Sequence, residues 1–136
     1  MGNAALISIY CGGILSLLMA IYHTRFYKLF RWEDEFRRIR ELNADIFYTI
    51  HVALFFLFFG FSILSFIFAK ELASCTGIAL GINLLFSSFW IWRTIWQIIY
   101  FRPSGKLRFL IIHYTLTIYF TLLAVSYLLP VILKLF

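Results

Sequence analysis

Four long apolar stretches separated by short polar connections dominate the pattern of residues along the chain. They cover residues 4–22, 46–69, 77–101 and 109–136. Each is near or above the roughly 20 residues that an α-helix needs to cross a bilayer. The pattern therefore predicts an all-α fold, in which a four-transmembrane-helix bundle forms a single domain over residues 1–136.

The connection over residues 24–45 is the only strongly charged part of the chain, and it lacks proline and glycine. It places two carboxylates four residues before an arginine, as Glu33 with Arg37 and Asp34 with Arg38. Opposite charges at this spacing stabilise a helix. We therefore expect a charged helix over 24–45 that continues into the second span, so that a long second helix extends into the cytoplasm. An amphipathic helix lying in the membrane interface is the alternative.

Composition and charge indicate a membrane protein and its orientation. The chain is 63% hydrophobic and 13% charged, whereas a soluble domain is about 25% charged. The basic residues that follow the first and third spans are Arg25, Lys28, Arg31, Arg37, Arg38 and Arg40, and Arg102, Lys106 and Arg108. Basic loops stay in the cytoplasm, so both termini are expected outside. Anionic lipid headgroups account for this charge, and no nucleic-acid partner is predicted.

A few polar side chains interrupt the apolar stretches. Arg93 lies inside the run W-I-W-R-T-I-W-Q-I-I-Y, and Gln97 follows one helical turn later. A charged residue in the middle of a spanning helix costs about 2.5–3.5 kcal/mol, so it needs a sheltered place. At ~1.5 Å per residue, His51, Arg93 and His113 all lie roughly 8–12 Å from the cytoplasmic ends of their spans. We predict a pocket in the cytoplasmic leaflet lined by His23, Tyr48, His51, Arg93, Gln97, His113 and Tyr114.

Several functions fit such a pocket. Arginine binds phosphate and carboxylate oxygens bidentately, so the leading hypothesis is an amphiphilic anion, lipid or quinone-like, or a partner subunit. His51 and His113 on facing helices could instead ligate a b-type haem in a membrane redox protein. A membrane enzyme with Arg93 as anion anchor is a further alternative, lipid-modifying or, as the family likeness given below implies, glutathione-modifying. No metal site is predicted, because the chain has no HxxxH or ExxH pair and no carboxylate within a span.

Small residues at a spacing of four could let helices approach closely. Gly12 and Ser16 form one such pair, and Gly77 and Gly81 form a GxxxG pair. Packing within the monomer explains the GxxxG pair about as well as dimerisation does. Four short spans leave much helix surface to cover, so we expect membrane lipids and either a homo-oligomer or a larger membrane complex as partners.

The segment from His23 to Phe101 resembles a group of small bacterial membrane proteins of about this length, for which no activity is assigned. The resemblance is carried by H-x-x-F-Y-K-L-F-R-W, L-N-A-D-I-F-Y-T-I-H and F-W-I-W-R-T-I-W-Q-I-I-Y-F. It implies four helices, and we expect the protein in the cell inner membrane. It also emphasises His23, Trp32, Asn43, His51, Arg93 and Gln97.

A more distant likeness is to the membrane-associated eicosanoid and glutathione metabolism family, trimeric four-helix enzymes with outside termini. In that family a basic first cytoplasmic loop runs into the second helix with an Arg, Asn and Glu motif. The stretch R-R-I-R-E-L-N-A-D offers Arg38, Arg40 and Asn43 at this place. The glutamate after the asparagine and the proline deeper in the helix are missing here.

Overall fold

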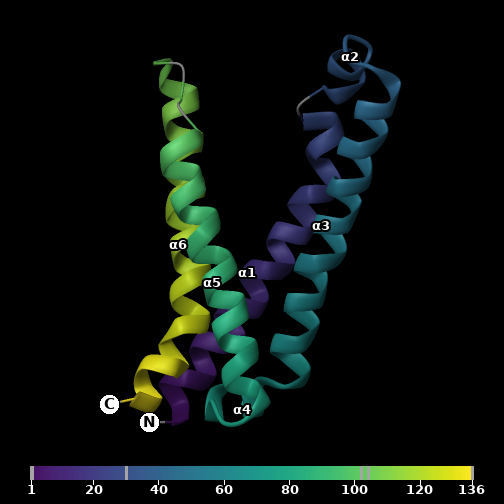
Figure 1. The fold of residues 1–136 in the computed structure, drawn as a ribbon. Helices are drawn as coiled ribbons and strands as arrows, with labels where there is room; N and C mark the ends of the chain where they lie inside the picture. Colours follow the sequence, from purple (N-terminus) through teal and green to yellow (C-terminus); the bar gives the residue numbers. More distant parts are fainter. Residues whose placement is uncertain (1, 30, 102, 104, 136) are drawn as a thin grey trace. The chain divides into compact units, whose positions relative to one another are not determined.

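The computed structural model describes residues 2–29, 31–101, 103 and 105–135 of the 136-residue chain. This part of the chain forms helices and no strand (Figure 1). The helices are α1 (Gly2–Leu29), α2 (Trp32–Phe36), α3 (Glu41–Ile67), α4 (Ala69–Ser74), α5 (Ile78–Tyr100) and α6 (Leu107–Leu135). The predicted all-α fold is confirmed.

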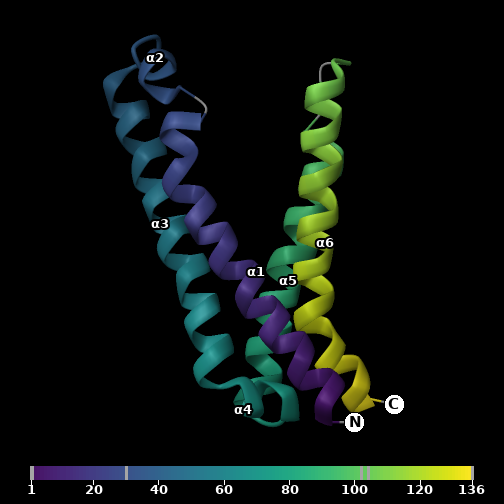
Figure 2. The ribbon, with the colours of Figure 1, turned by 180° about the vertical axis from the view of Figure 1, so that it is seen from behind.

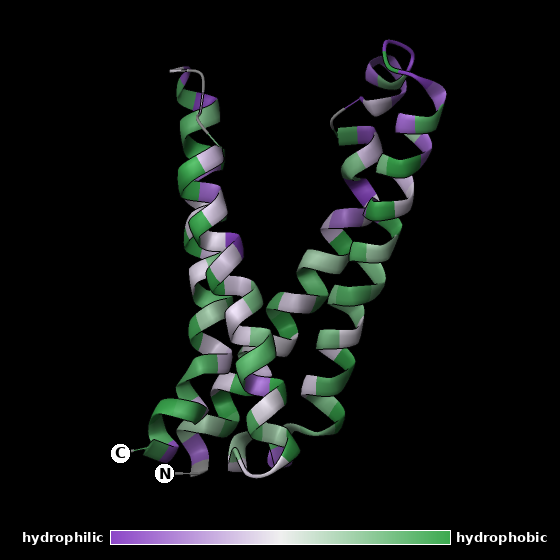
Figure 3. Ribbon diagram, in the orientation of Figure 1, coloured by the Kyte–Doolittle hydropathy of each residue, from purple (hydrophilic) through white to green (hydrophobic). Residues whose placement is uncertain are grey.

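Four of these helices, α1, α3, α5 and α6, are long and apolar enough to cross a membrane. Figure 3 shows that hydrophobic residues cover most of their length, whereas α2 and the turns beside it are largely hydrophilic. α5 has the lowest mean hydropathy of the four over its most apolar stretch, 1.4 against 2.1–2.4 for the others, because polar residues such as Asn83 and Arg93 interrupt it. The chain is therefore a multi-pass membrane protein, as its sequence predicts.

The charged connection is not one helix over 24–45, so this prediction is wrong. α1 continues to Leu29, Arg31 has a left-handed backbone with φ 51°, and α2 is only five residues long. Residues 37–40 then form a turn before α3 begins at Glu41. α1 extends past residue 24 to Leu29, so the chain can reverse direction toward α3 only within the connection itself, and a continuous helix over 24–45 would leave no place for that reversal.

Local charges assist the break before α2. Three acidic residues occupy its first turn, where the helix dipole favours negative charge. The predicted Glu33–Arg37 pair forms at 3.0 Å, but Asp34 pairs with Arg31 at 2.6 Å instead of with Arg38. The acidic run thus starts a new short helix. α3 does begin before its apolar stretch, by about one turn.

The chain divides into two compact units, and each is described by itself. One unit comprises residues 1–12 and 65–136, and the other comprises residues 13–64. We call them the terminal unit and the central unit. A single transmembrane domain over the whole chain stays a prediction.

In the terminal unit, α5 and α6 run side by side, and the short α4 packs against both (Figures 1 and 2). Tyr127 on α6 is completely buried, and its hydroxyl lies 2.8 Å from the hydroxyl of Ser65. Its ring lies directly against Gly12, where a Cβ would come within 2.8 Å of the ring carbon Cζ. Asn83 joins α5 to α4 by donating a hydrogen bond of 2.8 Å to the carbonyl oxygen of Leu72.

Candidate functional site

The seven predicted pocket residues fall into two groups, one in each unit. His23, Tyr48 and His51 belong to the central unit, whereas Arg93, Gln97, His113 and Tyr114 belong to the terminal unit. One pocket lined by all seven stays a prediction. We describe the two groups separately, as the Arg93 cluster (Arg93, Gln97, His113 and Phe120) and the histidine pocket around His23 and His51.

The Arg93 cluster joins the end of α5 to the start of α6. Gln97 lies one turn after Arg93 and therefore on the same face of α5. Gln97 is completely buried, and its amide nitrogen Nε2 lies 3.3 Å from Nδ1 of His113 on α6. Because the amide group donates, Nδ1 of His113 accepts. Tyr114, the other predicted residue here, is 62% exposed and its ring meets the His113 ring edge-on.

Arg93 lies over an aromatic ring, not beside a carboxylate. Its guanidinium carbon is 4.4 Å from the centre of the Phe120 ring, and Phe120 in turn stacks on Trp90. Stacking of this kind stabilises a cation by about 0.5–2 kcal/mol. The nitrogen Nη1 of Arg93 and the oxygen Oε1 of Gln97 are buried without a hydrogen-bond partner among the described residues.

The position of Arg93 along α5 makes this lack of partners significant. Arg93 precedes the end of α5 at Tyr100 by seven residues, which corresponds to about 10 Å. In the terminal unit the sequence has a single acidic residue, Glu71, and it lies on α4, before α5 begins. The ion pairs found in the described part of the chain, Arg31–Asp34 and Glu33–Arg37, both lie in the central unit. Arg93 therefore has no counter-charge on α5 or α6.

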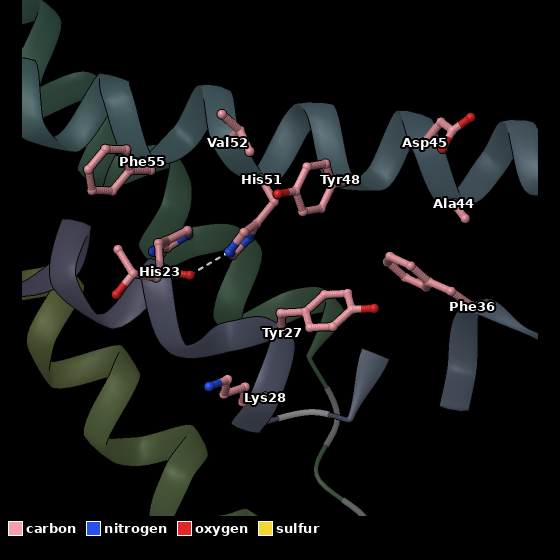
Figure 4. A pocket seen from close by; sticks show the side chains of 11 residues that line it. His23, Tyr27, Lys28, Phe36, Ala44, Asp45, Tyr48, His51, Val52 and Phe55 are labelled. Atoms are coloured by element: carbon pink, nitrogen blue, oxygen red, sulfur yellow. Dashed lines mark hydrogen bonds between the residues drawn. The ribbon is translucent and has the colours of Figure 1, made fainter. Parts of the chain in front are cut away.

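The histidine pocket is built where α1 and α3 pack against each other. Nε2 of His51 on α3 donates a hydrogen bond of 2.6 Å to the carbonyl oxygen of His23 on α1 (Figure 4). The two imidazole rings are stacked with centres 4.8 Å apart. Nδ1 of His23 donates to the carbonyl oxygen of Met19 at 3.0 Å. Both proton positions follow because a backbone carbonyl oxygen can only accept.

A hollow of about 630 Å³ opens beside these histidines, between the end of α1, α2 and the start of α3. Figure 4 shows the rings of Tyr27, Phe36 and Tyr48 around it. Lys28 and Asp45 also contribute to its lining. Behind it, the rings of Trp32 and Phe26 contact His51 at centre distances of 4.8 and 5.0 Å.

Two residues of this lining, Tyr27 and Phe36, were not expected from the sequence. Both were placed on a charged helix that was expected to project from the membrane. The aromatic residues recurring through F-Y-K-L-F-R-W and at Phe36 were the available signal, because exposed charged helices rarely need so many rings. The turn over residues 37–40 returns Phe36 toward α3, where it also stacks on Phe47.

The geometry gives little support to haem or to metal binding. Nε2 of His51 is committed to the carbonyl oxygen of His23, so ligation through this nitrogen would break that hydrogen bond. His113 lies in the other unit. Among the described residues, no group of three or more His, Cys, Asp or Glu side chains could hold a metal ion.

The residues behind the glutathione-enzyme likeness lie at the start of α3. Arg38 and Arg40 are exposed in the turn, and Asn43 is exposed in the first turn of the helix. The carbonyl oxygen of Arg40 accepts from the backbone nitrogens of Asn43 and Ala44. None of the three lines the histidine pocket. Arg102, from the predicted basic set, lies outside the described residues.

Comparisons of the chain with protein-family models, with curated proteins and with solved structures gave no match.

Proposed function

We propose that this protein binds an anionic amphiphile, lipid or quinone-like, in the cell inner membrane through Arg93. The observation that carries the proposal is the guanidinium on a membrane-spanning helix that stacks on Phe120 but has no carboxylate on α5 or α6. A phosphate or carboxylate group from outside the chain would supply the missing charge.

The energetics favour such a ligand. An arginine in a spanning helix costs about 2.5–3.5 kcal/mol on insertion scales, and the aromatic stack offsets only about 0.5–2 kcal/mol of that. Hydrogen bonds to a charged group contribute about 1.5–3 kcal/mol each. One bidentate contact with an anion therefore more than balances the remaining cost.

The depth of Arg93 suits the headgroup of an amphiphile. It lies about 10 Å inside the end of α5, below the level at which Tyr100 and the basic third connection meet water. An anionic group could reach this depth with its apolar tail directed into the bilayer. In the proposed orientation this is the cytoplasmic leaflet, with both termini outside, because the first and third connections carry most of the basic residues.

A partner subunit with an intramembrane carboxylate could satisfy the same guanidinium. We place the lipid first because anionic phospholipids surround any inner-membrane protein, and the long arginine side chain can extend from Arg93 toward their headgroups. The haem and glutathione-enzyme alternatives have no observation in their favour.

The test is retention of bound lipid by the purified full-length protein, measured by native mass spectrometry after reconstitution with equal amounts of phosphatidylglycerol and phosphatidylcholine. Arg93→Gln should lower the preference for phosphatidylglycerol about 10- to 100-fold, the equivalent of a charge-assisted hydrogen bond. Arg93→Lys keeps the charge but loses the planar guanidinium, so its preference for phosphatidylglycerol should lie between those of the wild-type protein and Arg93→Gln. Arg108→Gln is the matched control, because it removes an exposed arginine from the start of α6, the end of that helix to which His113 of the Arg93 cluster belongs.

Equal lipid preference in the wild-type protein and in Arg93→Gln would overturn the proposal. If Arg93→Gln instead dissociates a co-purifying subunit while lipid retention is unchanged, the partner carries the counter-charge. If Arg108→Gln lowers the preference as much as Arg93→Gln does, general surface charge explains the binding and the specific site is refuted.

A further inference from the structure

The histidine pocket has the dimensions and the lining of a small-molecule site. Its volume of about 630 Å³ lies within the roughly 300–1,000 Å³ usual for ligand pockets, which are mostly apolar with a few polar groups. Tyr27, Phe36 and Tyr48 supply ring faces from three different helical segments. Val52 and Phe55 extend the lining along α3 toward its apolar interior. A flat ring with an apolar tail would match these walls.

The charges in the lining favour a neutral headgroup. Lys28 on α1 and Asp45 on α3 are the charged residues that line the pocket, and Figure 4 shows them on opposite sides of it. One positive and one negative charge give no net preference for an anion or a cation. This separates the histidine pocket from the Arg93 cluster, where a single positive charge is unbalanced.

The proton on His51 determines which kind of polar group could bind there. Because Nε2 donates to the carbonyl oxygen of His23, a neutral His51 carries its lone pair on Nδ1. Nδ1 makes no hydrogen bond within the described part of the chain. The ring is half-buried and lines the pocket. His51 therefore offers a hydrogen-bond acceptor, which recognises a hydroxyl group and does not recognise a carbonyl or an ether oxygen.

We propose that the histidine pocket binds a neutral amphiphile whose flat aromatic headgroup carries a hydroxyl, such as a hydroquinone. The hydroxyl donates a hydrogen bond to Nδ1 of His51, and the ring stacks among Tyr27, Phe36 and Tyr48. Pairs of aromatic rings gain about 0.5–1.5 kcal/mol beyond the area that they bury. The tail leaves along Val52 and Phe55 into the bilayer. This site does not depend on the anion site at Arg93.

The test compares two probes, a decyl-substituted hydroquinone and its dimethyl ether, in which methoxy groups replace the hydroxyl donors. Their affinities for the detergent-purified full-length protein are measured by isothermal titration under argon. The wild-type protein should bind the hydroquinone about two- to ten-fold more tightly, which is the fold-change given by one neutral hydrogen bond. His51→Phe keeps a flat ring but removes the acceptor, so the ratio of the two affinities should fall to about one.

Two further variants keep the test sharp if His51→Phe does not fold. Tyr48→Leu removes one wall of the pocket, so it should weaken both probes similarly and leave the ratio unchanged. Thr49→Val is the matched control, because the Thr49 hydroxyl is bonded to the carbonyl oxygen of Asp45 on the same helix and does not line the pocket. It should change neither affinity.

Three results would overturn the inference. Equal binding of the hydroquinone and the ether to the wild-type protein would show that a lipid chain or any apolar molecule fills the pocket. Unchanged affinities in Tyr48→Leu would place the probes elsewhere. A ratio that falls in Arg93→Gln but not in His51→Phe would assign hydroquinone binding to the Arg93 cluster. Loss of phosphatidylglycerol preference in Arg93→Gln, by contrast, concerns the first proposal alone.

Discussion

Replacing Gly12 by alanine should destabilise the protein, because Gly12 packs directly against the ring of Tyr127. A Cβ at Gly12 would lie 2.8 Å from Cζ and 3.1 Å from two neighbouring carbons of the Tyr127 ring. Real Cβ atoms essentially never approach a neighbour so closely. The ring cannot easily retreat, because Tyr127 is completely buried and its hydroxyl lies 2.8 Å from that of Ser65. Gly12→Ala should therefore behave as an overpacked core and lose about 1–3 kcal/mol of unfolding free energy.

The chain supplies a matched control for this substitution. Gly81 also lies within a long apolar helix, but a Cβ there would meet nothing within 4 Å. Alanine is the better helix former by about 0.5–1 kcal/mol, so Gly81→Ala should be neutral or slightly stabilising. The difference between the changes in unfolding free energy of the two alanine variants thus reports on the contact between Gly12 and Tyr127.

The assay is reversible unfolding in mixed detergent micelles, with the free energy taken from a titration with sodium dodecyl sulfate. The double variant Gly12→Ala/Tyr127→Leu should lose less unfolding free energy than the sum of the losses in the two single variants. The smaller leucine side chain leaves room for the new methyl group. Equal free energies for Gly12→Ala and Gly81→Ala would refute the argument. Strict additivity in the double variant would show that the cost of Gly12→Ala arises somewhere other than at Tyr127.

The other predictions concern α4, the orientation of the chain and haem. Asn83→Leu should lose about 1 kcal/mol in the same unfolding assay, because the carbonyl oxygen of Leu72 loses the Asn83 donor and keeps only the longer bond of 3.2 Å from the Cys75 backbone nitrogen; an unchanged value would mean that the Asn83 bond does not stabilise the packing of α4 on α5. A cysteine placed at either terminus should react with an impermeant maleimide in intact cells, whereas one at Arg38 should react only after permeabilisation; the reverse pattern would invert the proposed topology. The purified protein should show no Soret band, because Nε2 of His51 is held by the carbonyl oxygen of His23; a band that is lost in His51→Phe would contradict this.

The long helices could be predicted because their signal is local. Each apolar stretch is long enough to span a bilayer, and no tertiary information is needed to read it. Gln97 and His113 were likewise expected to line the same pocket, and the structure brings the Gln97 amide nitrogen to 3.3 Å from Nδ1 of His113. The stack of Arg93 on Phe120 could not be foreseen. It depends on the rotation of α6 about its own axis, which no residue spacing specifies.

The connection over 24–45 shows what local signals leave out. Helix propensity and charge spacing favoured one helix there, and both are properties of neighbouring residues. The requirement that α1 and α3 form an antiparallel pair is a property of the whole unit, and it outweighs them. The break brings the Trp32 ring into contact with His51 and places Phe36 in the lining of the pocket beside it. Because the turn was not predicted, Tyr27 and Phe36 were not expected in the lining of the pocket.

The two small-residue pairs make the same point about glycine. Gly77 has φ 53° and precedes α5, so a backbone conformation that other residues rarely adopt explains the glycine, and no packed helix face is needed. Gly81 has open space where a side chain would be. Neither glycine of the GxxxG pair is therefore in close contact with the described residues of its own unit. Gly12, in contrast, is tightly packed, but against a tyrosine ring and not against the backbone of another helix. Small residues four apart show only that another helix could approach closely. Whether a glycine is needed there depends on which side chain packs against it.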